Sequence, residues 1–304
     1  MNTETVIIND VGPRDGLQNQ PKHLSVEERL RLIRAVEAAG VRDIEVGSFV
    51  SPKAVPAMAG TDQIMAGLDK TSGRNYSALI PNMKGYELAR NAGTPTVAMV
   101  LYASEGMAQK NVNMSLQQAE AVTLDILERA REESVRIIAT IAVAFECPFD
   151  GPTDPARVED IAARFVDAGV EQIVIADTIG AGNPQQVSRL TRKLVDTNGA
   201  DRVACHFHDT RAMGLANVYA ALESGVRRFD ASIAGLGGCP FAPGASGNVA
   251  TEDVVMMLEQ MGVSTGIDLG KLVEAVELAI DLTGSCTGGK SIKWLRRQVE
   301  KGVL

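Results

Sequence analysis

Several residue types are scarce in this chain of 304 residues, and each scarcity excludes a class of protein. Basic residues are outnumbered by acidic ones, 30 against 38, so the net charge is −8. An acidic chain without a basic block is a poor binder of nucleic acid. No apolar run reaches the roughly 18 residues of a membrane span. The N-terminus, residues 1–5, lacks the charged and apolar regions of a signal peptide, so we expect a cytoplasmic protein.

Cysteine and histidine are also rare. Four cysteines are scattered without a CxxC pair: Cys147, Cys205, Cys239 and Cys286. In a chain without a secretion signal they are expected to be thiols rather than disulfides. Only three histidines are present, and two of them, His206 and His208, are two residues apart. This spacing requires an explanation.

Short apolar runs alternate with longer segments of helical period along the chain. The runs predict strands at residues 5–11, 41–47, 75–80, 95–102, 135–145, 172–177, 202–208 and 228–234. Helices are predicted at 25–39, 62–68, 84–91, 115–132, 154–168, 184–197, 212–224, 251–261 and 269–282. Eight strands that alternate with helices indicate an α/β fold, a (β/α)8 TIM barrel with extra C-terminal helices. A doubly wound open sheet is the alternative.

The alternation is even and has no linker, which predicts a single catalytic domain over residues 1–304. Polar residues recur where the predicted strands end, and barrel active sites lie at those ends. They are Arg14, Asp15, Glu45, Asp177, His206, His208 and Asn248. Residues 284–291, GSCTGGKS, match the phosphate-loop pattern, but they follow a helical segment rather than a strand. We therefore interpret that match as chance.

The two histidines fall at residues i and i+2 of a predicted strand, so they project to the same face, the barrel mouth. The alternative is a pair of hydrogen-bonded histidines without a metal. Asp209 follows them, and imidazole with carboxylate and amide oxygens suits a divalent ion such as Mg²⁺, Mn²⁺ or Zn²⁺. Asp15 and Asn248 are candidates for the oxygen ligands. This combination favours a metal site.

The segment that joins the first strand to the first helix, residues 12–19, has its backbone fixed by Pro and Gly. Its Arg14 and Asp15 either pair with each other in a turn or act on metal and substrate. Glu45 lies in an apolar strand and needs a partner, for which Arg14 is the obvious choice. Asp177 is expected to hold the metal-binding side chains in place without contacting the metal itself.

The stretch at residues 235–250 contains many glycines, which predicts an active-site loop that acts as a mobile lid above the barrel mouth. Cys239 lies in it between Gly238 and Pro240, with little to bury it. A structural thiol normally lies in an apolar element, so we interpret Cys239 as reactive.

Six motifs together resemble 3-hydroxy-3-methylglutaryl-CoA lyases, in the same order and over nearly the whole chain. They are GPRDGLQN (12–19), EVGSFVSPK (45–53), PNMKGYE (81–87), DTIG (177–180), HFHDT (206–210) and GLGGCPFAPGASGNVATED (235–253). The resemblance implies a metal-dependent TIM-barrel lyase that cleaves a 3-hydroxyacyl-CoA to acetyl-CoA and acetoacetate by retro-Claisen chemistry. It also implies a homo-oligomer, a dimer or tetramer.

The resemblance also implies roles for individual residues. Asp15, His206, His208 and Asn248 would bind the divalent cation. Arg14 would stabilise the enolate oxygen, Glu45 would support the site, and Cys239 and His206 would move protons, in an order that the sequence leaves open. CoA phosphates need a local basic patch, for which Lys53 and Lys84 are the candidates.

The chain departs from the family at Gln20-Pro21, Met114, Glu146 and residues 211–213. These positions are expected to line the acyl pocket, where Arg211 would meet a carboxylate placed differently from that of hydroxymethylglutarate. Citramalyl-CoA, cleaved to acetyl-CoA and pyruvate, is therefore the close alternative substrate. Further alternatives are a condensing synthase of the isopropylmalate or homocitrate type, an aldolase that needs no CoA, and a scaffold protein without activity.

Overall fold

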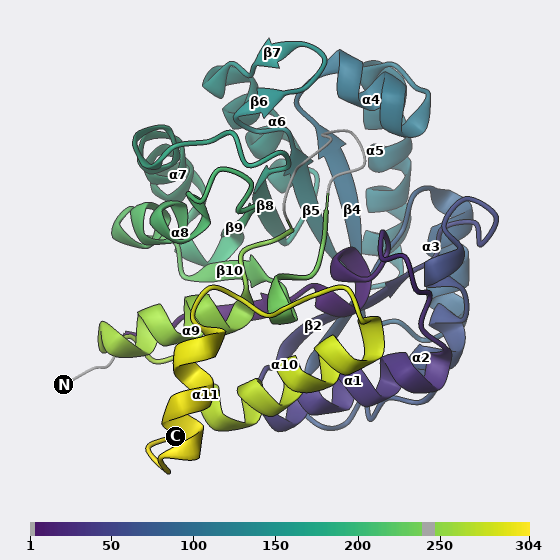
Figure 1. Ribbon diagram of the computed structural model, residues 1–304. Helices are drawn as coiled ribbons and strands as arrows, with labels where there is room; N and C mark the ends of the chain where they lie inside the picture. Colours follow the sequence, from purple (N-terminus) through teal and green to yellow (C-terminus); the bar gives the residue numbers. More distant parts are fainter. Residues whose placement is uncertain (1–3, 239–246) are drawn as a thin grey trace.

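Eight parallel strands close into a barrel in the order β1-β10-β9-β8-β5-β4-β3-β2 (Figure 1). The structure is a computed structural model that describes residues 4–238 and 247–304. The barrel strands are Ile7–Asp10 (β1), Asp43–Ser48 (β2), Asn75–Leu79 (β3), Thr96–Tyr102 (β4), Arg136–Ala142 (β5), Gln172–Asp177 (β8), Val203–Phe207 (β9) and Arg228–Ala231 (β10). The closed order confirms the predicted TIM barrel and excludes the open sheet.

Helices surround the barrel and cover the outward faces of its strands (Figure 1). Between the strands they are Val26–Ala38 (α1), Thr61–Ala66 (α2), Met83–Asn91 (α3), Glu105–Val112 (α4), Leu116–Glu132 (α5), Pro155–Asp167 (α6), Pro184–Asn198 (α7) and Gly214–Glu223 (α8). After the barrel come Thr251–Gln260 (α9), Leu269–Thr283 (α10) and Ile292–Glu300 (α11). The expected start of α1 is confirmed: Ser25 and Glu28 form a reciprocal capping box.

Three elements were not foreseen from the sequence. Helix α4 separates from α5 at Asn113, which adopts the left-handed conformation at φ 55°. Helix α11 adds a third C-terminal helix where two are predicted. The fifth predicted strand ends at Ala142 because Val143 has a positive φ of 53°, and a two-stranded hairpin follows, Glu146–Cys147 (β6) and Gly151–Pro152 (β7). Helix α4 and the hairpin lie at the barrel mouth, so the prediction from the sequence is least accurate near the site.

The rejected phosphate-loop match is explained by the fold. Residues 284–291 connect α10 to α11, so a helix and not a strand precedes them. Their backbone N–H groups already have acceptors within the protein. The amide of Gly289 donates to Glu252 at 2.7 Å, and the amides of Lys290 and Ser291 donate to Asp253 at 2.7 and 2.8 Å. These amides therefore bind two carboxylates of the chain itself, those of Glu252 and Asp253.

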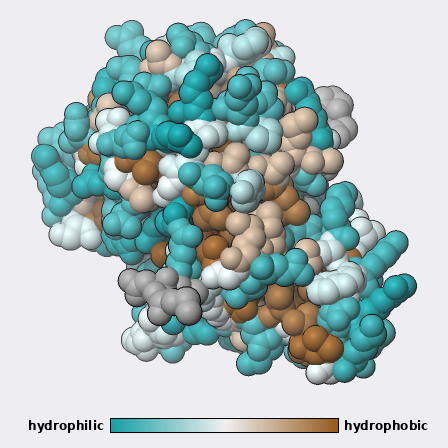
Figure 2. All heavy atoms as spheres, turned by 90° about the vertical axis from the view of Figure 1, so that its left-hand side faces the viewer, coloured by the Kyte–Doolittle hydropathy of each residue, from teal (hydrophilic) through white to brown (hydrophobic). Residues whose placement is uncertain are grey.

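The outer surface is largely hydrophilic on the face shown in Figure 2, with hydrophobic residues gathered in a band through its middle and lower right. Large exposed apolar side chains include Trp294, Val299, Val303 and Leu304, on and after α11. Within the described part of the chain, no helix combines the length and apolarity needed to cross a membrane. The described cysteines, Cys147, Cys205 and Cys286, are free thiols, as expected.

Candidate metal and catalytic site

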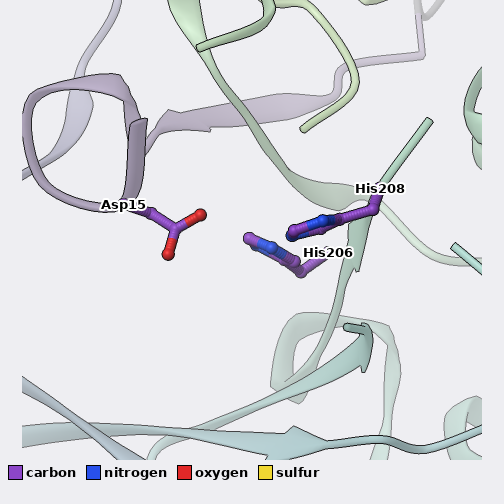
Figure 3. A group of neighbouring side chains, drawn as sticks. All are labelled: Asp15, His206 and His208. Atoms are coloured by element: carbon purple, nitrogen blue, oxygen red, sulfur yellow. The ribbon is translucent and has the colours of Figure 1, made fainter. Parts of the chain in front are cut away.

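A carboxylate and two imidazoles meet at the C-terminal mouth of the barrel. Asp15, His206 and His208 each offer one ligand atom, and these three atoms lie within 4.8 Å of one another. Figure 3 shows the Asp15 carboxylate pointing from one side toward the two histidine rings, which project together from the opposite side. We call these three residues the triad.

Strand parity places the two histidines as predicted. His206 belongs to β9 and His208 follows its end, and their ring centroids are 5.2 Å apart. Cys205 and Phe207 alternate with them and lie in the hydrophobic core, at 0% and 1% exposure. A change of register by one residue would exchange these two pairs of side chains.

Asp15 is positioned by a π-helical turn, Gly12–Gly16, directly after β1. The buried Asp10 holds the start of this turn, since its Oδ1 accepts from the amide of Gly12 at 2.8 Å. Its Oδ2 accepts from the Thr251 hydroxyl at 2.7 Å. Any side chain at residue 12 would collide with Ile233, whose Cγ2 lies 2.7 Å from the Cβ position. Glycine is therefore required where the turn approaches the barrel wall.

The pKa of Asp15 is lowered to about 2. Burial works against this shift, but Arg14 and then the two histidines favour the carboxylate, so Asp15 is ionised at neutral pH. Arg14 Nη1 lies 2.8 Å from Asp15 Oδ1, and Gln18 Nε2 donates to the same oxygen at 3.1 Å. A carboxylate with two imidazoles is a suitable donor set for a divalent cation, which would bind the imidazoles in their neutral form.

Asn248 lies beside the triad, in an isolated bridge with His208. Its Nδ2 donates to Asp15 Oδ2 at 2.7 Å, and its Oδ1 is buried without a hydrogen-bond partner. Rotation of the amide by 180° would exchange the two atoms and present the oxygen on the side of Asp15. The unpartnered oxygen indicates that the site can accept a group absent from the structure, and a divalent cation fits the donors present.

Arg14 and Glu45 form the ion pair expected from the sequence. Arg14 Nε lies 2.6 Å from Glu45 Oε2, and the Glu45 side chain is 4% exposed. Burial lowers the pKa of the guanidinium, but Glu45 and Asp15 outweigh it, so the net pKa of Arg14 lies above its usual value. Held on two sides by carboxylates, Arg14 keeps a fixed orientation beside the triad.

Asp230 is a site residue that the sequence reasoning missed. It lies on β10 in register with His206, and its Oδ2 is 3.1 Å from His206 Nδ1. Its Oδ1 accepts from Asn9 Nδ2 at 2.8 Å. Burial lowers the pKa of His206, but hydrogen bonding to Asp230 outweighs it and raises the pKa overall. The sequence contained one signal for this role, since Asp230 is an acidic residue within the apolar strand predicted at residues 228–234.

The triad opens into a cavity of about 610 Å³ inside the barrel. Arg14, Asp15, Gln18, His206 and His208 line it, together with Gly238 at the edge of the loop 235–250. Asn19 Nδ2 donates to the Gly238 carbonyl at 3.2 Å, which ties this loop to the first βα segment. Cys239 and the rest of the proposed lid, residues 239–246, lie outside the described residues.

The two proposed CoA lysines do not line the cavity. Lys53 and Lys84 are exposed, each beside residues that do line it, Ala54 and Asn82. Their role in binding CoA stays a prediction.

Two expectations about the acyl pocket are wrong. Arg211 does not line the cavity; its side chain is 52% exposed and pairs with Glu146 at 3.7 Å, so two departures from the family contact each other. Gln20 lies away from the cavity as well, whereas Met114 lines it.

Asp177 was expected to support the proposed metal ligands, but it is not directed at them. Its two oxygens accept from the amides of Ala181 and Gly182 at 2.8 and 3.0 Å.

A (β/α)8 barrel with a carboxylate and two histidines at its mouth defines a protein with a candidate divalent-metal site at the catalytic face of the fold. The family is defined by comparison with known proteins. Residues 5–279 match the family model described as HMGL-like, and the chain belongs to this family.

The relatives cover nearly the whole chain. One from Pseudomonas aeruginosa, named 3-hydroxy-3-isohexenylglutaryl-CoA/hydroxy-methylglutaryl-CoA lyase, is 42% identical over 286 residues, 94% of this chain and 95% of the relative. The (R)-citramalyl-CoA lyase of Chloroflexus aurantiacus is 44% identical over 283 residues, 90% and 89% of the two chains. A solved HMG-CoA lyase from Acinetobacter baumannii, in complex with coenzyme A and 3-methylmalate, has a TM-score of 0.92 at 37% identity and 96% coverage of each chain.

Proposed function

We propose that the protein is a divalent-metal-dependent carbon–carbon lyase that cleaves 3-hydroxy-3-methylglutaryl-CoA, or a close 3-hydroxyacyl-CoA, to acetyl-CoA and acetoacetate. The observation that carries the proposal is the position of Arg14 beside the triad, where both line the cavity of the barrel. The names of relatives that are 42% and 44% identical support the reaction class.

In a retro-Claisen cleavage a base takes the proton of the C3 hydroxyl, the C2–C3 bond breaks, and the acetyl-CoA enolate is protonated. A divalent cation, Mg²⁺ or Mn²⁺ with Zn²⁺ as a further option, would act as a Lewis acid and hold two substrate oxygens in one orientation. Asp15, His206, His208 and Asn248 would hold it. Arg14, fixed by Glu45 at 2.6 Å, would stabilise negative charge on the thioester oxygen.

Proton transfer is assigned to His206 and Cys239. Imidazole and thiol groups can both exchange protons near neutral pH. His206 lines the cavity with its Nδ1 held by Asp230, so Nε2 is the one nitrogen left, and it can carry a proton only while it does not hold the cation. Cys239 follows Gly238, which lines the cavity.

Citramalyl-CoA, which would give acetyl-CoA and pyruvate, is the second candidate substrate. The relative from Chloroflexus aurantiacus, 44% identical, favours it. Lys53 and Lys84 remain the candidates for binding CoA phosphates. We also propose a cytoplasmic homo-oligomer, a dimer or tetramer, supported by the exposed apolar side chains on and after α11. Light scattering would measure its mass.

An assay of acetyl-CoA release tests the proposal. Hydroxymethylglutaryl-CoA and both enantiomers of citramalyl-CoA should be compared, each with Mg²⁺ and with EDTA. We expect cleavage of at least one substrate, with loss of activity in EDTA. Absence of acetyl-CoA from all of them would contradict the lyase assignment.

A further inference from the structure

Arg29, on α1, is a buried arginine that has no carboxylate partner within the described part of the chain. It is 1% exposed. Its Nη1 donates to the Ala59 carbonyl at 3.1 Å, and its Nη2 donates to the Val46 carbonyl at 3.1 Å. Its Nε is buried without a hydrogen-bond partner. Burial lowers the pKa of the guanidinium to about 10, so the group is still charged at neutral pH.

Packing alone does not account for Arg29, because a charge buried without a counterion is unfavourable. An unbranched apolar side chain such as methionine would fill much of the same space, and such replacements of buried charges are often neutral or stabilising. The guanidinium supplies what an apolar side chain lacks, hydrogen bonds to two carbonyls on separate segments. These two carbonyls therefore indicate what the arginine does.

The first carbonyl belongs to a β-bulge directly after Glu45. The register of β2 against β3 shifts between Glu45 and Gly47, which makes Val46 the extra residue. The pairing of β2 with β1 ends before it, at Ile44. Among the described strand pairs Val46 has no partner residue, and Arg29 holds its carbonyl. Since a bulge bends the strand and changes the direction of nearby side chains, the bulge controls where Glu45 points.

The second carbonyl, that of Ala59, lies at the far end of the loop that follows β2. This loop, residues 49–58, connects β2 to the segment before α2. Several of its residues line the cavity that contains the triad: Val50, Ser51, Ala54 and Val55. Arg29 thus joins the two ends of a loop that forms part of the site.

A second set of contacts ties the same two ends together. Thr61 Oγ1 accepts from the amide of Ser48 at 3.2 Å and donates to the Met58 carbonyl at 2.9 Å. A Cβ at Gly47 would lie 2.5 Å from Thr61 Oγ1 and 3.0 Å from Arg29 Nη2. Glycine at residue 47 therefore lets both polar groups approach the strand. Their helices, α1 and α2, are neighbours on the outside of the barrel (Figure 1).

We propose that Arg29 is a positioning residue for the cleavage reaction, whose guanidinium fixes the bulge at Val46 and thereby holds Glu45 against Arg14. Arg29 does not line the cavity, so it acts only through the groups that it holds. This inference rests on the proposed lyase function and adds a residue to it.

The ion pair of Arg14 with Glu45 transmits the effect. Arg14 Nε lies 2.6 Å from Glu45 Oε2, and this contact orients the guanidinium that would stabilise the enolate. A shift of the backbone at Val46 displaces the neighbouring Glu45 and releases Arg14 from its orientation. A displacement of about 1 Å at a reacting group can lower a rate about a hundredfold. Because Arg14 acts on charge that develops in the transition state, the loss is expected in kcat.

The test substitutes Arg29 by methionine, which has no donor. We expect kcat for acetyl-CoA release to fall about ten- to hundredfold in Arg29→Met. Arg29→Lys keeps the charge but lacks the planar fork that reaches two carbonyls, so its kcat should lie between Arg29→Met and the wild type. Ile33→Ala is the matched control. Ile33 is fully buried one turn further along the same face of α1, so the variant loses packing but keeps both carbonyl contacts and should retain the wild-type kcat.

A double-mutant cycle separates positioning from general destabilisation. If Arg29 acts through Glu45, Arg29→Met should lower kcat by less than about threefold when Glu45→Gln is already present. Three results would each overturn the inference: a loss of less than about tenfold in Arg29→Met, an equal loss in Ile33→Ala, or two losses that multiply in the double variant.

A crystal structure of Arg29→Met tests the same inference without an assay. The contact between Arg14 Nε and Glu45 Oε2 should lengthen beyond about 3.5 Å, the limit of a hydrogen bond. An unchanged bulge and an unchanged ion pair would overturn the positioning role. Absence of acetyl-CoA release by the wild type would overturn the proposed function instead, and the structure would still decide on Arg29. If Arg29→Met does not fold, Arg29→Lys replaces it in both measurements.

Discussion

Asp230 and His206 lie side by side on β10 and β9, with Asp230 Oδ2 3.1 Å from His206 Nδ1. A carboxylate behind a histidine fixes the ring and leaves the other nitrogen, Nε2, for a metal or a proton. Asn9 in turn holds the second oxygen of Asp230 at 2.8 Å. The orientation of His206 is thus determined by three neighbouring strands of the barrel.

Asp230→Ala is therefore expected to weaken divalent-metal binding by about ten- to a hundredfold. The variant loses the carboxylate that orients His206 but keeps every proposed ligand. Titration with Mn²⁺, followed by electron paramagnetic resonance, measures the affinity directly. Asp230→Asn retains an acceptor oxygen and should fall between Asp230→Ala and the wild type. Equal affinity in all three proteins would contradict a positioning role.

His208→Ala should abolish metal-dependent cleavage while the fold is retained, because it removes one donor from a cluster of three. We expect acetyl-CoA release to fall at least a hundredfold, by analogy with the loss of several kcal/mol of Lewis-acid stabilisation. His23→Ala is the matched control, since His23 is exposed. Full activity of metal-stripped wild-type protein would refute the metal hypothesis.

Cys239→Ser should lower kcat by more than tenfold with little change in KM, because a hydroxyl exchanges protons poorly near neutral pH. Steady-state kinetics of acetyl-CoA release separate the two constants. Cys286→Ser serves as the control, since that thiol is half-buried beside Thr283 on the C-terminal segment. An unchanged rate in Cys239→Ser would remove this residue from the mechanism.

Glu252 predicts a pH-dependent contribution to stability. Burial raises the pKa of this carboxyl from 4.5 to about 7. Between those values the folded chain holds a proton that the unfolded chain has released, so stability from this group falls as the pH rises from 4.5 to 7. The change amounts to at most about 3 kcal/mol.

Glu252→Gln isolates this contribution. The carboxylate accepts from the amides of Ala234 and Gly289 on separate oxygens, whereas an amide offers only one acceptor. The variant should therefore lose about 1–3 kcal/mol of stability. Because Glu252 stabilises the folded wild-type protein more at low pH, the difference in the free energy of unfolding between the two proteins should be larger at pH 5 than at pH 8. Urea denaturation at both values measures it, and an equal difference at both would disprove the raised pKa.

The sequence was sufficient to predict the barrel and the triad. Strand parity placed His206 and His208 on one face, and the end of β1 placed Asp15 at the mouth; both depend only on local period and strand direction. The pairing of Arg14 with Glu45 followed from the need of a buried carboxylate for a partner.

Other features depend on contacts across the barrel and could not be predicted. Asp230 is 24 residues from His206, and only the register of β9 against β10 brings them together. Arg211 follows His208 closely, yet its side chain turns outward to Glu146 because the chain has already left the strand.

The arrangement of the triad and Arg14 at the barrel mouth has a stereochemical consequence. C3 of the proposed substrates carries a hydroxyl, an alkyl group and two unequal arms, so it is a chiral centre. With the hydroxyl held near the triad and the thioester beside Arg14, the alkyl group and the carboxylate arm face different parts of the cavity. Only one handedness of C3 fits this arrangement, and a racemic ester should be consumed to one half.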